Sequence, residues 1–82
     1  MREFHIMIRS LQDVKDFVAL SSAQPFPVIV GSDSQNINGK DFMGMFSLDY
    51  RYPQRVRVRC SEEEFTRFLH AAQAFVANAF AG

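Results

Sequence analysis

The sequence predicts one α+β domain in which three helices cover one face of a four-stranded antiparallel sheet. Segments 3–8 and 54–60 alternate apolar and polar residues, as strands with one buried face do. Segments 11–18 and 65–76 space their apolar residues as amphipathic helices do. The chain has 82 residues, 48% hydrophobic and including nine Phe, and therefore fits a single domain over residues 1–82.

The chain order of the elements is strand, helix, strand, strand, short helix, strand and helix. We expect the first six over segments 3–8, 11–21, 26–30, 35–38, 42–46 and 54–60, and the last helix from its cap at Ser61 through residue 76. Ser10 with Asp13 marks the start of the first helix, and Ser61 with Glu64 forms a capping box at the start of the last one. Because each alternating strand has one apolar face, the helices are expected on that face, and the other face stays open.

The segment around Asp41 has two readings. Asn38-Gly39 is a favourable hairpin turn, which would pair residues 35–37 with residues 40–42. The cluster that follows, Phe-Met-Gly-Met-Phe over 42–46, does not alternate, however. Asp41 before that cluster favours a short helix with Asp41 as its N-cap. We expect Gly82 and the small residues before it to fray.

The charges are balanced, with nine basic and nine acidic side chains. This balance makes nucleic acid or an anionic membrane an unlikely partner, and it gives little protection against self-association. Arg55, Arg57 and Arg59 share the polar face of one predicted strand. They form either a solvated face or a basic surface for an acidic partner or a nucleic-acid backbone, although three arginines are few for strong nucleic-acid affinity.

No cofactor or metal is expected. His5 and His70 lie on different elements without carboxylates at ligand spacing, and Cys60, the only cysteine, falls on the apolar face of its strand. A single cysteine permits no internal disulfide and favours a reducing compartment. Neither a signal-peptide core nor a stretch near the ~20 apolar residues of a membrane span is present, so we expect a cytoplasmic protein without membrane insertion.

One segment, Ile37-Asn-Gly-Lys-Asp-Phe-Met-Gly-Met-Phe-Ser-Leu48, carries a family resemblance. It resembles the Val-x-Ala-Lys-Ser-Ile-Met-Gly-x-x-Ser-Leu segment of the HPr phosphocarriers of the sugar phosphotransferase system. The match covers about a dozen residues and is moderately specific. The element order β-α-β-β-α-β-α is also that of the family. The resemblance implies an HPr-like open-faced β-sandwich.

The sequence departs from the family where the carriers hold their phosphorylated histidine. Carriers have Gly-Leu-His-Ala-Arg-Pro between the first strand and the first helix, whereas residues 8–14 here read Ile-Arg-Ser-Leu-Gln-Asp-Val. Phosphoryl transfer through histidine needs an exposed imidazole nitrogen and donors for the phosphate. A helix start and Arg9 supply donors, but the nucleophile is missing. We therefore carry no catalytic residue over and expect no enzyme activity.

The resemblance also points to a surface for protein partners. Asp41 stands where many family members carry a regulatory serine, so it either mimics the phosphorylated serine or only caps the helix. Phe42 and Met43 match an apolar docking patch beside that serine. Lys40, Asp41, Phe42 and Met43, with Arg9, are thus the candidate partner-binding residues, whereas Met45 and Leu48 are expected in the core.

The function expected from these features is a non-catalytic protein-interaction or regulatory module related to the phosphotransferase system. One alternative is a genuine carrier that uses another acceptor, such as Ser10 or His5. Another is a self-associating structural domain. The sequence does not name the partner or the pathway.

Overall fold

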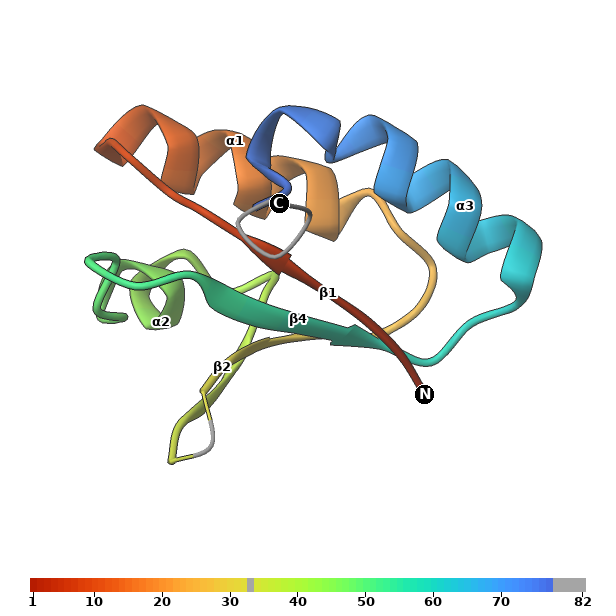
Figure 1. Ribbon diagram of the computed structural model, residues 1–82, viewed down its shortest axis with the longest axis horizontal. Coiled ribbons are helices and arrows are strands. Elements are labelled where there is room, and N and C mark those ends of the chain that lie inside the picture. The colour runs from red at the N-terminus through yellow and green to blue at the C-terminus, as the bar shows by residue number, and fades with distance from the viewer. Residues whose placement is uncertain (33, 78–82) are drawn as a thin grey trace.

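The computed structural model describes residues 1–32 and 34–77. The predicted element order is confirmed: β1 (Arg2–Ile6), α1 (Leu11–Ser22), β2 (Val28–Gly31), β3 (Asn36–Asn38), α2 (Phe42–Phe46), β4 (Gln54–Val58) and α3 (Glu62–Ala71). A 3₁₀ turn, Gln73–Phe75, follows α3. The four strands pair in the order β1-β4-β2-β3, and every pairing is antiparallel. Figure 1 shows α1 and α3 together on one side of this sheet.

The alternation in the strands sets which face is covered. Phe4 pairs with Val56, and Val56 pairs with Val30, so the three buried side chains form one row across the inner face. Val30 in turn pairs with Ile37 of β3. A Cβ built on Gly44 of α2 would lie 2.7 Å from Ile37 Cγ2. The short helix α2 therefore also packs on the inner face, where only a glycine permits so close an approach.

Aromatic rings fill the space between the sheet and the helices. Phe68 of α3 is 1% exposed, and its ring centroid lies 5.8 Å from that of Phe4 and 5.6 Å from that of Phe26. Phe17 of α1 lies 6.3 Å from Phe68, so one ring joins both long helices to the strands. The two pairs that Phe68 makes with Phe4 and Phe26 are edge-to-face, and such pairs stabilise a core beyond the area that they bury.

The C-terminal segment differs from the prediction. The apolar stripe suggested one helix through residue 76, but α3 ends at Ala71, and the chain then runs beside β1. Met7 N donates to Phe75 O at 2.7 Å, and Ala77 N donates to His5 O at 2.8 Å. The reason is that β1 is an edge strand, whose outward N–H and C=O groups need partners. The expected fraying before Gly82 lies outside the described residues.

Strand and helix bounds otherwise differ from the prediction by a few residues at their ends, as is usual for such boundaries. The predicted caps of Ser10 and of the Ser61–Glu64 capping box are confirmed. Within residues 1–32 and 34–77, the structure contains no helix with both the length and the apolar character that a bilayer crossing demands.

Candidate functional site

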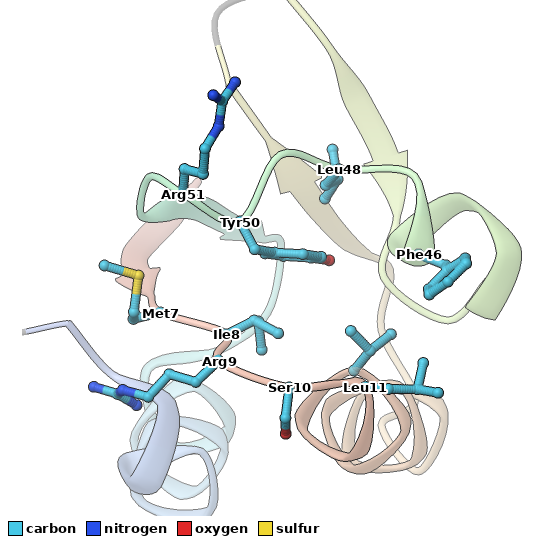
Figure 2. A pocket seen from close by; sticks show the side chains of 10 residues that line it. Met7, Ile8, Arg9, Ser10, Leu11, Phe46, Leu48, Tyr50 and Arg51 are labelled. Atoms are coloured by element: carbon cyan, nitrogen blue, oxygen red, sulfur yellow. The ribbon is translucent and has the colours of Figure 1, made fainter.

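A hollow of about 640 Å³ lies between the start of α1, the end of α2 and the loop that leads to β4. Figure 2 shows Leu11 of α1 and Phe46 of α2 on one side of it and Met7 and Arg51 on the other. Ile8, Leu48 and Val14 are buried beneath it. We call the surface made by Leu11, Met43 and Phe46 with this hollow the α1–α2 face. The two helices are in contact, and Leu11 of one and Phe46 of the other line the same hollow.

The start of α1 satisfies its own backbone donors. Ser10 Oγ accepts a hydrogen bond from Asp13 N at 3.1 Å, and Asp13 Oδ2 accepts one from Arg9 N at 3.1 Å. The side chain of Arg9 is exposed and points away from the hollow (Figure 2). Arg9 therefore lies at the rim of the α1–α2 face, where it adds a positive charge.

Helix α2 presents apolar side chains to solvent. Asp41 Oδ1 accepts a hydrogen bond from Met43 N at 3.1 Å, which confirms the predicted N-cap. Met43 is 70% exposed, whereas Phe42 is half-buried and stacks on Phe46 with ring centroids 6.0 Å apart. Of these two candidate partner-binding residues, Met43 is therefore the one that is open to solvent. Met45 is buried, as expected, and anchors the helix from below.

Lys40 is placed differently from the other candidate residues. Its Nζ donates to the backbone O of Gln24 at 2.8 Å, and its backbone N donates to Asn38 Oδ1 at 2.9 Å. Lys40 lines a second hollow together with Phe26, whereas Arg9 lines the hollow of the α1–α2 face. Lys40 thus ties the connection between β3 and α2 to the end of α1. Its predicted role in contacting a partner stays a prediction.

The loop from α2 to β4 is held by three polar contacts. Tyr50 donates its O–H to Met45 O at 2.5 Å, and burial raises the pKa of Tyr50 to about 12. Arg51 binds both carboxylate oxygens of Asp49, at 3.0 and 2.8 Å, and this pairing lowers the pKa of Asp49 to about 2. Gln54 Nε2 donates to Asp49 O at 2.7 Å. One wall of the hollow is therefore ordered by the chain itself.

The sequence-based selection missed Leu11 and Phe46. Leu11 is 49% exposed and Phe46 is 55% exposed. A signal was present for both. Leu11 is the first helical residue, so no preceding turn covers it, and Phe46 lies four positions after Phe42 on a helix of only five residues.

The polar and titratable residues show no metal-binding arrangement within the described ranges. There, no three His, Cys, Asp or Glu side chains come together as ion ligands. Cys60 is half-buried, and burial, with a contribution from Glu64, raises the pKa of its thiol. A raised pKa keeps the thiol protonated and makes it a poor nucleophile.

Comparison with known proteins supports the architecture. No family model matches the sequence, and no curated protein does either. Among solved structures, the crystal structure of HPr-C-His from Thermoanaerobacter tengcongensis matches with a TM-score of 0.69 at 24% sequence identity. The match covers 88% of this chain and 90% of that one. The protein therefore has an HPr-like fold, an open-faced β-sandwich of the α+β class, as the sequence predicted.

Proposed function

We propose that the protein is a non-catalytic, HPr-like interaction or regulatory module related to the sugar phosphotransferase system. It docks onto protein partners through the α1–α2 face. The observation that carries the proposal is that Leu11 and Phe46, each about half exposed, line one hollow, while Met43, 70% exposed, lies three positions before Phe46 on the same short helix. Single exposed apolar residues are ordinary, but a contiguous apolar surface on a small domain marks an interaction site.

The same surface has the composition of a docking site. Methionine is flexible and polarizable, and an aromatic ring contributes a large contact area, so both are enriched at protein–protein interfaces. Arg9 lines the hollow, and its exposed charge can select a partner with acidic residues at the rim, whereas Arg51 is already paired with Asp49. Asp41 caps the start of α2 and adds a negative charge there. In our proposal this charge also takes the place of the charge on a phosphorylated serine.

The connection between β1 and α1 supports the proposal that the protein is not catalytic. Residues 7–10, Met-Ile-Arg-Ser, contain no histidine, and the two histidines of the chain belong to β1 and α3. Ser10, which caps the helix, has an alcohol oxygen that is a weak nucleophile without an adjacent base. We accordingly propose that the protein carries no phosphate on a family-type histidine and is not an enzyme. The cytoplasm is the compartment in which we expect it to act.

A carrier that uses another residue remains the alternative of a different class. Ser10 is exposed at the start of a twelve-residue helix beside Arg9, a position that suits a phosphoryl group. A third candidate is self-association through the same apolar face, which the zero net charge does not oppose. Concentration-dependent sizing chromatography separates this third candidate from the first two.

The docking proposal is tested by an NMR titration with the first enzyme of the phosphotransferase system as the probe. We expect amide signals of α2 and of the start of α1 to shift. The double variant Met43→Ala/Phe46→Ala should bind at least about tenfold more weakly. The control Thr66→Ala, at an exposed site on α3, should bind as the wild type does. Shifts confined to α3, or equal binding by both variants, would contradict the proposed surface.

A further inference from the structure

The outer face of the sheet carries a polar surface, separate from the apolar α1–α2 face. Strand register places Arg55 opposite His5 and Gly31, and Arg57 opposite Glu3 and Ile29. These residues alternate with the buried ones, so they face away from the helices. Arg59 continues the alternation beyond the end of β4 and is exposed.

This outer face is predominantly basic. Among its described residues, three arginines stand against one carboxylate, that of Glu3. Arg57 Nη2 donates to Asn36 Oδ1 at 2.5 Å, which holds one edge of the guanidinium in place. A guanidinium has five N–H donors, so one such bond leaves donors for a further acceptor. Arginine is the residue best suited to receive carboxylates in a paired geometry.

The spacing of the arginines identifies the kind of partner. Side chains on the same face of a strand repeat every two residues, about 6.8 Å apart. An extended peptide with Glu or Asp at alternate positions repeats its carboxylates at the same distance. We propose that the outer face binds an extended, acidic protein segment of this pattern through Arg57 and Arg59. This binding is independent of the function proposed for the α1–α2 face.

Two other occupants fit the surface less well. Single-stranded nucleic acid binds open sheets through Phe, Tyr or Trp rings that stack on bases, and the described residues of the outer face include none of these. A second copy would have to offer its acidic run at the start of α3. That run is helical, and it already uses Glu63 in an ion pair with Arg67 and Glu64 in the capping box.

The experiment measures fluorescence anisotropy of a labelled peptide of alternating Glu and Thr. Arg57→Gln/Arg59→Gln should weaken binding about fivefold, since each exposed ion pair contributes modestly. The control Lys15→Gln/Arg67→Gln removes the same two charges from exposed sites on the helices and should leave binding unchanged. Amide shifts should map to β4 and β1. The variant Met43→Ala/Phe46→Ala should bind this peptide normally, which distinguishes a failure here from a failure of the docking face.

Several results would overturn the proposal. No binding of the alternating peptide at low salt, or equal losses in the two charge variants, would reduce the surface to a solvated face. Equal affinity for a peptide with all its Glu residues in one block would remove the role of the spacing. Tighter binding of an oligo-dT strand would assign the surface to nucleic acid. Sizing that shows a dimer disrupted by Arg57→Gln/Arg59→Gln would assign it to a second copy.

Discussion

Two methionines of α2 provide a matched test of which side of the helix is structural. Met43 is 70% exposed and Met45 is fully buried, only two positions away. Replacing each by Ala makes the same chemical change with the same effect on helix propensity. The difference between the two variants therefore reports burial alone.

The expected magnitudes differ severalfold. Truncating a buried Met to Ala costs about 2–5 kcal/mol, because transfer free energy is lost and a cavity remains. Full burial of a Met side chain is worth about 1.5–3 kcal/mol, and Met43 retains less than a third of that burial. We therefore expect Met43→Ala to cost less than about 1 kcal/mol. For a chain of 82 residues the whole stability is about 4–12 kcal/mol, so Met45→Ala should bring the domain near its unfolding threshold.

Urea denaturation followed by far-ultraviolet circular dichroism measures both free energies. On the temperature scale, a loss of 1 kcal/mol lowers the melting temperature of a domain this size by about 4–8 °C. Met43→Ala should melt close to the wild type, while its binding to the partner in the NMR titration is weakened. Equal large losses of stability in the two variants would show that Met43 is simply packing, and the docking face would lose its central residue.

Three further predictions concern the surrounding structure. Burial raises the pKa of Tyr50 from 10.0 to about 12. The contribution of Tyr50 to stability is therefore complete below pH 10 and is lost as the pH rises toward 12. Tyr50→Phe should remove this alkaline loss of stability in a pH series of thermal melts. Gly44→Ala should lower stability by about 1–3 kcal/mol, because the new methyl group meets Ile37, and the loss should shrink in an Ile37→Ala background. Ser21 Oγ is buried and has no hydrogen-bond partner among the described residues, so Ser21→Ala should raise the melting temperature; a lowered one would reveal an unseen partner.

The sheet and the helix starts could be predicted because alternation and helix caps each depend on residues close together in the sequence. Alternation in β1 and β4 decides which side chains face the helices, and serine and aspartate caps act within three residues. Alternation also places Gln54 on the inner face with Val56 and Val58, but its burial depends on Nε2 donating to backbone carbonyls of the preceding loop. A buried amide is stable only with such partners, which the alternation does not reveal.

The candidate site was predicted less completely than the fold. Asp41 as the cap of the short helix is confirmed, and of the two candidate residues Phe42 and Met43 only Met43 is exposed. The bond from Lys40 to Gln24 O joins residues sixteen positions apart, so only the packing of α1 beside the β3–α2 connection creates it. The hollow that brings Leu11 beside Phe46 arises in the same way, from the contact between two helices.

The central claim is that this HPr-like fold serves binding and carries no phosphate. The most direct measurement is intact mass after incubation with phosphoenolpyruvate and the first enzyme of the phosphotransferase system. A histidine-containing HPr in the same mixture is the positive control. The account predicts that the control gains a phosphoryl group while the mass of this protein stays unchanged. A stable gain of one phosphoryl group, lost on Ser10→Ala or His5→Gln, would contradict the account and make the protein a carrier.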